Sequence, residues 1–122
     1  MKGRPLRSTL DEALAIAQLR GIVQRTMNGP ERLYDFAIVG TIPLAFVRLR
    51  FANRLLIDLA MIARLYREEI RRLRMVSRDQ GNSLELWLRS RYGTWLFFRV
   101  DTGSISEIDR TGTILSMHPL PA

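Results

Sequence analysis

Two apolar runs near the middle of the chain have the pattern of neighbouring strands. They occupy residues 34–39 and 44–51, with glycine and proline in the turn between them. In the second run, Arg48 and Arg50 fall on one face and the apolar residues beside them fall on the other, because strand side chains alternate between faces. Asp35 opens the first run. We therefore predict that Asp35 lies near both arginines across the two strands.

The beginning of the chain has helical periodicity followed by a strand pattern. Thr9 and Glu12 have the spacing of a capping box, in which a hydroxyl and a carboxylate satisfy the first amides of a helix. Apolar residues then recur at helical spacing up to Gly21, which suits the left-handed position after a helix. We expect a helix over residues 9–20 and a strand over 22–27. A helix that continues to residue 27 is the alternative.

The rest of the chain predicts a second helix and further strands. Asp58 can cap a helix that runs to about Val76, with apolar residues on one side and arginines on the others. Alternation over residues 84–89 and the largely apolar run 95–100 predict two strands, the latter central in the sheet. Residues 104–117 have room for a short hairpin around a Thr-Gly turn.

These elements predict an α/β fold. We expect one domain over residues 1–122, with a mixed β-sheet flanked by two main helices in the order α-β-β-β-α-β-β, and with loose termini at 1–8 and 118–122. Cysteine is absent, no apolar run approaches the roughly 20 residues of a membrane span, and no signal peptide is visible. We therefore expect a cytoplasmic protein with no membrane partner.

The charge of the chain is concentrated in its central half. The formal net charge is +7, and twelve arginines stand between residues 48 and 99 against five acidic residues. A basic surface of this kind favours a polyanion such as nucleic acid, because neutralised phosphates release counterions. A solvated arginine face without a ligand is the alternative. The candidate nucleic-acid contacts are Arg48, Arg50, Arg64, Arg67, Arg71 and Arg74.

Four segments mark the order of these elements: Arg20-Gly21-Ile22-Val23, Tyr34-Asp35-Phe36-Ala37-Ile38, Val47-Arg48-Leu49-Arg50 and Gly93-Thr94-Trp95-Leu96-Phe97-Phe98. In this order and in these segments the chain resembles the PD-(D/E)xK, restriction-endonuclease-like nuclease fold, and within it the small archaeal Holliday-junction resolvases. The resemblance covers roughly residues 9–100. In that family an aspartate, and a glutamate two positions before a lysine, hold Mg²⁺ over the scissile phosphate.

The chain departs from the family at the motif itself. Asp35 matches the aspartate, but Arg48 stands at the glutamate position and Arg50 at the lysine position. A guanidinium repels Mg²⁺, which needs oxygen ligands, and Arg50 is a poor proton acceptor because its pKa is above ~12. The resemblance implies that Asp35 and Arg50 are catalytic remnants, and we expect no metal or cofactor. The alternative, which the cost of an unpaired buried charge favours, is that Asp35 is an ion-pair partner of Arg48 or Arg50. Three carboxylates elsewhere are candidates for a rearranged Mg²⁺ site: Asp11, Glu12 and Glu69.

Three functions remain open. The first is an inactive nuclease-like domain that binds nucleic acid through its arginines, and the second is a Mg²⁺-dependent nuclease with rearranged carboxylates. The third is a structural or assembly protein whose fold is inherited and whose charge is incidental. A homodimer is expected from the resemblance and from the many apolar strand residues. Trp87 and Trp95 are expected to pack rather than to stack on bases, and His118 is assigned no role because it falls in the predicted tail.

Overall fold

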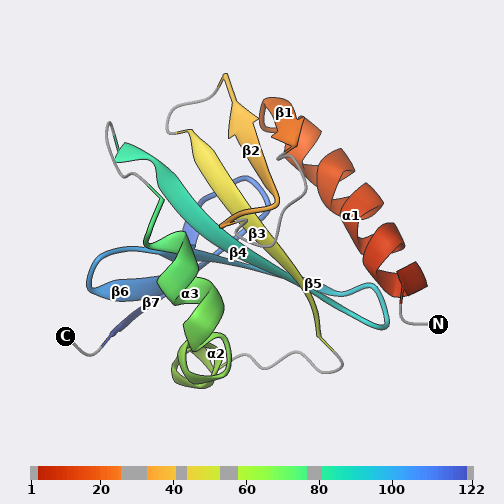
Figure 1. Cartoon of the computed structure of the whole chain (residues 1–122). Coiled ribbons are helices and arrows are strands. Elements are labelled where there is room, and N and C mark those ends of the chain that lie inside the picture. Colours follow the sequence, from red (N-terminus) through yellow and green to blue (C-terminus); the bar gives the residue numbers. More distant parts are fainter. Residues whose placement is uncertain (1–2, 26–32, 41–43, 53–57, 77–80, 121–122) are drawn as a thin grey trace.

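The computed structural model describes residues 3–25, 33–40, 44–52, 58–76 and 81–120, with the backbone alone for residues 3–8. Figure 1 shows how the helices and strands of these residues are arranged. In chain order they are α1 (Gly3–Gln18), β1 (Ile22–Arg25), β2 (Phe36–Val39), β3 (Ala45–Ala52), α2 (Leu59–Leu65), α3 (Arg67–Leu73), β4 (Ser83–Ser90), β5 (Trp95–Val100), β6 (Ser104–Ile108) and β7 (Ile114–Pro119).

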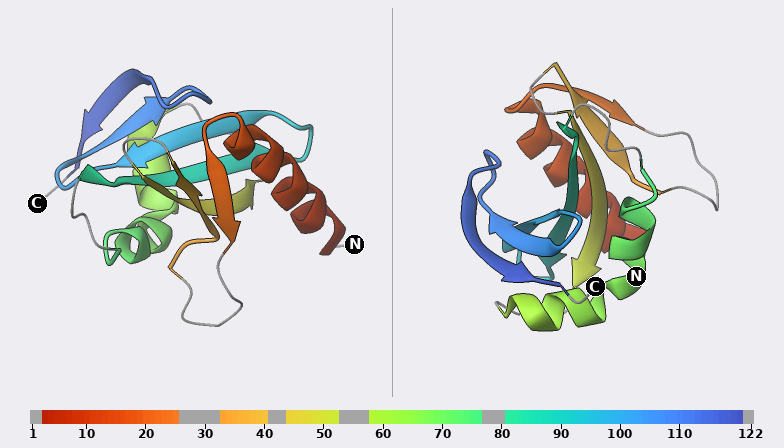
Figure 2. Two further views of the ribbon diagram at one scale, coloured as in Figure 1. Left: turned by 90° about the horizontal axis from the view of Figure 1, so that it is seen from above. Right: turned by 90° about the vertical axis from the view of Figure 1, so that its left-hand side faces the viewer.

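The strands of the described residues form one mixed sheet in sequence order, β1-β2-β3-β4-β5-β6-β7. All neighbouring strands are antiparallel except β3 and β4, which run parallel over eight residue pairs from Ala45↔Ser83 to Ala52↔Ser90. A parallel pair needs a long crossover, and α2 with α3 supplies it. The predicted α/β class and mixed sheet are confirmed. Figure 2 shows that the sheet is strongly coiled.

The central strand pair lies where the sequence predicts it. Phe36 pairs with Val47 and Ile38 with Ala45, so residues 36–38 and 45–47 are antiparallel neighbours. Residues 22–25 form a strand rather than a continued helix, which decides between the two alternatives for this segment. Residues 26 and 27, and the Asn-Gly-Pro turn after them, lie outside the described residues.

The predicted start of the first helix is wrong. Helix α1 begins at Gly3, so residues 3–8 are helical rather than loose, and Thr9 lies inside the helix with a fully buried side chain. Glu12 is therefore in the middle of the helix, where its carboxylate binds Arg89 of β4 instead of a terminal amide. The capping-box spacing occurred by chance within a longer helix.

The predicted helix over residues 58–76 is two helices. Asp58 caps the first, accepting a hydrogen bond from the Ala60 amide at 2.9 Å. Tyr66 interrupts the helix with φ −110° and ψ 30°. On either side of this break, α2 packs against β6 and β7 whereas α3 packs against β3 and β4. The two short helices therefore pack on different parts of a coiled sheet. The local sequence around Tyr66 has no helix-breaking residue that predicts this break.

The predicted C-terminal hairpin is confirmed, but the predicted tail is partly wrong. The carboxylate of Asp109 accepts hydrogen bonds from the Thr111 and Thr113 amides, and Gly112 takes the positive φ of the turn at 97°. Strand β7 continues through His118 to Pro119, and the Leu120 amide then donates to the Gly103 carbonyl at 2.8 Å. His118 thus belongs to the sheet.

Two hydrophobic cores lie on the two faces of the sheet. Here they are called the α1-side core and the α2/α3-side core. Trp87 is buried in the first, which confirms that it packs, and Phe98 is buried in the second. Alternation along β4 and β5 supplies both cores at once, as the apolar run of residues 95–100 predicts. Alternation also places Arg48 and Arg50 on the α2/α3 side, opposite Val47 and Leu49 in the α1-side core.

Candidate functional site

The predicted contact between Asp35 and Arg48 is present. Asp35 immediately precedes β2, and its amide donates to the Val47 carbonyl of β3 at 2.7 Å. Its carboxylate accepts the Leu49 amide at 2.6 Å and lies 3.7 Å from a guanidinium nitrogen of Arg48. Both charged side chains are largely buried, with exposures of 13% for Asp35 and 9% for Arg48. The pair balances two charges that would be costly to bury singly.

Arg50 is bound to a different carboxylate from the one we predicted. Its Nε donates to Glu69 of α3 at 3.0 Å, and its Nη1 donates to the Leu49 carbonyl at 3.0 Å. The neighbouring Tyr66 hydroxyl is affected by the same charges. Burial and the negative charge of Glu69 raise the pKa of Tyr66, while the positive charge of Arg50 opposes them.

The three carboxylates considered for a rearranged Mg²⁺ site do not gather around Asp35. Glu12 belongs to the α1 side of the sheet, where Arg89 and Trp95 donate to it, and Asp11 is exposed on α1. Glu69 shares the face of Arg50 but is held by that arginine. Within the described residues, no group of three or more histidine, cysteine or acidic side chains has the arrangement of a metal site.

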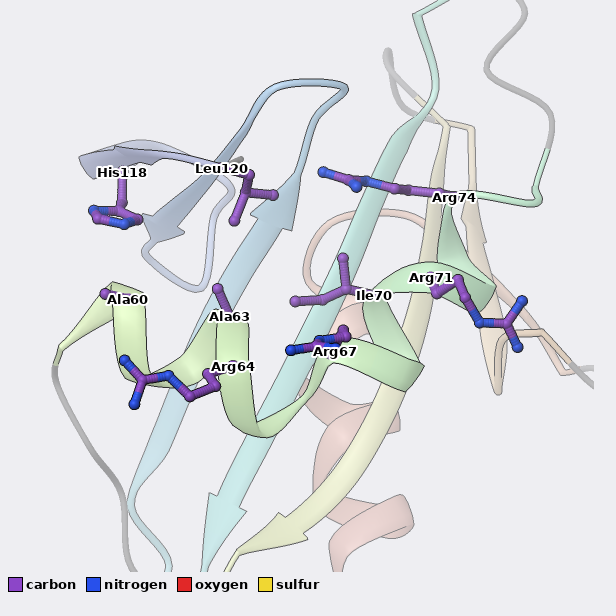
Figure 3. Close-up of a pocket in the computed structure, with 9 residues that line it drawn as sticks. All are labelled: Ala60, Ala63, Arg64, Arg67, Ile70, Arg71, Arg74, His118 and Leu120. Carbon is purple, nitrogen blue, oxygen red and sulfur yellow. The ribbon is translucent and has the colours of Figure 1, made fainter. Parts of the chain in front are cut away.

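The four candidate arginines of the predicted second helix gather at one groove. This groove, here called the arginine groove, has a volume of about 610 Å³ and lies between α2 with α3 on one side and the end of β7 on the other (Figure 3). Its charged lining residues are Arg64, Arg67, Arg71 and Arg74, with His118 on the opposite wall. The remaining lining residues are apolar: Ala60, Ala63, Ile70 and Leu120.

The groove arginines differ in the hydrogen bonds and ion pairs that they make within the protein. Arg71 makes two hydrogen bonds to Glu68, which lower the pKa of Glu68 and raise that of Arg71. Arg74 donates to the carbonyls of Asp101 and Thr102, both at 3.2 Å, and so lies across one end of the groove.

The other two groove arginines are exposed at the junction of the short helices. Arg64 is in the last turn of α2 and Arg67 is the first residue of α3. No ion pair joins either of them to an acidic residue in the described ranges. In Figure 3 both side chains lie at the helix pair, across the groove from His118 and Leu120. Their charge is therefore available to an external anion.

The six predicted contact arginines thus form two separate sets. Arg48 and Arg50 belong to the ion-pair network of the sheet, and neither lines the groove. The other four share one surface, the lining of the groove. The opposite wall of the groove lies in residues 118–120, which the sequence predicts to be part of a tail, so the sequence pattern gives no signal for it.

A buried carboxylate on the α1 side was also missed. Glu85 of β4 is 1% exposed and accepts four hydrogen bonds. Arg20, which follows α1, donates two of them at 2.9 and 3.0 Å, and the Ser83 hydroxyl and Trp87 indole donate the others at 2.7 and 2.9 Å. A glutamate between apolar residues of a strand was the available signal. Its partner Arg20 is 65 residues away and could not be inferred.

A second ion pair joins α1 itself to β4. Arg89 donates to both oxygens of Glu12, at 3.0 and 2.7 Å, and the Trp95 indole adds a hydrogen bond at 3.2 Å. Arg20 and Arg89 are therefore neutralised within the fold and contribute little to the basic surface. Trp95 packs beside Phe97 and Trp87, in agreement with the predicted packing role.

Comparison of the chain with protein-family models, with curated proteins and with solved structures gives no match. No helix among the described residues is long and apolar enough to cross a membrane.

Proposed function

We propose that this domain binds nucleic acid through the arginine groove and does not cleave it. The observation that carries the proposal is the pair Arg64 and Arg67, whose charges have no acidic partner in the described residues, beside a groove that two further arginines line. Phosphates are the natural ligands of such a cluster, since guanidinium groups donate paired hydrogen bonds to them. The resemblance to nuclease-like folds favours nucleic acid over other polyanions.

The same geometry argues against the Mg²⁺-dependent nuclease. Asp35 is 3.7 Å from Arg48 and Glu69 is 3.0 Å from Arg50, so a divalent ion beside either carboxylate would meet a guanidinium. We expect no cleavage of four-way junction, duplex or single-stranded DNA in the presence of Mg²⁺ or Mn²⁺. Cleavage that is lost in Asp35→Ala would establish the nuclease instead.

Binding is tested by comparing two double variants that remove the same charge. Arg64→Ala/Arg67→Ala removes the groove charges, and Arg91→Ala/Arg110→Ala removes two exposed arginines that lie over the rings of Tyr92 and Phe97. The readout is fluorescence anisotropy of labelled DNA and RNA at about 50 and 200 mM salt. Both variants change the net charge equally, so any difference reports position rather than total charge.

The groove variant should bind about tenfold more weakly at the lower salt concentration, and its log-log salt dependence on duplex should be shallower by about 1.8 for two lost phosphate contacts. The control variant should keep most of the affinity. Equal losses in the two variants would mean that the groove has no special role. Absence of any binding at about 50 mM salt would favour the structural or assembly function.

A further inference from the structure

The arginine groove has an apolar floor as well as a charged rim. Ala60 and Ala63 of α2 are small, and Ile70 and Leu120 face the same space from α3 and from the residue after β7 (Figure 3). The hollow exists because two alanines stand where larger side chains would fill it. The volume, about 610 Å³, is within the range in which proteins enclose small organic ligands, roughly 300–1,000 Å³.

An apolar floor beside cationic side chains matches a ligand with two parts. One part must be apolar enough to lie on Ala63, Ile70 and Leu120, and the other must be anionic and lie beside Arg64 and Arg67. An unpaired nucleotide has this form, because its base has two apolar faces and its phosphates lie next to the sugar. A duplex keeps its bases stacked inside, so it can offer only phosphates to the arginines and leaves the floor unused.

We propose that the arginine groove receives one unpaired nucleotide, so that the protein binds single-stranded nucleic acid more tightly than duplex. The base lies on the floor, and the adjoining phosphates bind Arg64 and Arg67. Arg74, fixed by its bonds to the carbonyls of Asp101 and Thr102, closes one end of the space. This inference rests on the proposed nucleic-acid function and adds the form of the ligand to it.

The decisive variant fills the groove without changing any charge. Ala63→Trp adds a large side chain to the floor, and Ala60→Trp does the same one helical turn earlier if the first variant folds poorly. Ala15→Trp is the matched control, because Ala15 is exposed on α1, at a helix that does not line the groove. Circular dichroism and thermal melting establish that each variant is folded.

The probes are a labelled single-stranded oligonucleotide, the same sequence as a duplex, and a single strand of equal length that lacks its bases. For the wild type, we expect the single strand to bind about tenfold more tightly than the duplex. The strand without bases should bind as weakly as the duplex. Ala63→Trp should lower single-strand affinity about tenfold and leave duplex affinity unchanged, whereas Ala15→Trp should change neither.

The two proposals fail in different ways. If single strand and duplex bind equally, or if Ala63→Trp affects neither, the groove does not hold a base, although the nucleic-acid function would stand. If none of the nucleic-acid probes binds, both proposals fall. A poly-glutamate peptide of equal charge is the last probe. If it binds the wild type as tightly as the single strand does, and binds the Ala63→Trp variant more weakly, the ligand is an acidic peptide and this inference is overturned.

Discussion

Glu85→Gln should destabilise the domain more than most single substitutions. The wild-type carboxylate is 1% exposed and accepts hydrogen bonds from Arg20, Ser83 and Trp87. A glutamine of the same shape has only one acceptor oxygen, and its amide group would point donors at donors. The guanidinium of Arg20, whose side chain is 12% exposed, stays charged because arginine does not lose its proton in proteins.

The size of the effect follows from the burial of the pair. Breaking a buried ion pair from one side costs about 3–5 kcal/mol, because the remaining charge has no partner. Domains of this size unfold with a free energy of about 5–15 kcal/mol, so the variant should lose a large part of its stability. With about 3–5 °C of melting temperature per kcal/mol, interpolated for a chain of this length, the midpoint should fall by about 10–20 °C.

Urea denaturation followed by circular dichroism measures this loss, and Glu107→Gln is the matched control. Glu107 lies on β6, is partly exposed, and should tolerate the change within about 0.5 kcal/mol. The double variant Arg20→Met/Glu85→Gln should lose clearly less than the sum of the two single variants, since the charges act as a pair. A loss below about 1 kcal/mol for Glu85→Gln, or strict additivity in the cycle, would refute the reasoning.

Three further predictions concern other parts of the molecule. Arg89 lowers the pKa of Glu12, so the stability from this pair is present above the ordinary pKa of 4.5 and is lost as the pH falls below it. Glu12→Gln should therefore lower the free energy of unfolding by about 0.5–1 kcal/mol at pH ~7, a small value because the Glu12 side chain is 43% exposed. In urea titrations, the difference in unfolding free energy between the variant and the wild type should shrink below pH ~4. Gly112→Ala should cost about 1–3 kcal/mol in thermal unfolding, because φ is 97° and the new Cβ would lie 3.2 Å from Arg20; the same change at Gly103, which has open space around it, should cost less. Homodimerisation remains a prediction, and Ile114, Leu115 and Met117, exposed on the edge strand β7, are a candidate surface for it. A mass of 14.1 kDa in light scattering would contradict it.

The contacts that the sequence predicts are those set by short-range periodicity. Asp35 and Arg48 meet because alternation and the antiparallel pairing of β2 with β3 fix the register of both strands. The groove arginines share a surface because they are spaced three or four residues apart, and the break at Tyr66 leaves α2 and α3 lining the same groove. In these two places the periodicity of the sequence was enough to predict the contact, because each contact joins neighbouring strands or neighbouring helical turns.

The contacts that escaped prediction depend on how distant segments pack. Arg50 binds Glu69 because of the position of α3 on the sheet, and Arg89 binds Glu12 from a strand 77 residues away. The second wall of the groove comes from His118 and Leu120, whose short, proline-flanked sequence has no strong strand pattern. Such contacts follow from tertiary geometry, which periodicity does not encode.

The parallel pairing of β3 with β4 has a consequence for how the chain folds. The other neighbouring strands are antiparallel and are joined by connections without a helix. The segments α1 to β3 and β4 to β7 can therefore each form from contacts that are local in the sequence. Among the described strands, the β3–β4 ladder, from Ala45↔Ser83 onward, is the strand pairing that joins the two segments, and the ion pairs Arg20–Glu85 and Glu12–Arg89 add side-chain contacts between them. This ladder must close across α2 and α3. Closing this long connection is the entropically expensive event of folding, and the expected slow step. A chain cut between α3 and β4 would turn that step into the association of two fragments, with a rate set by their concentration.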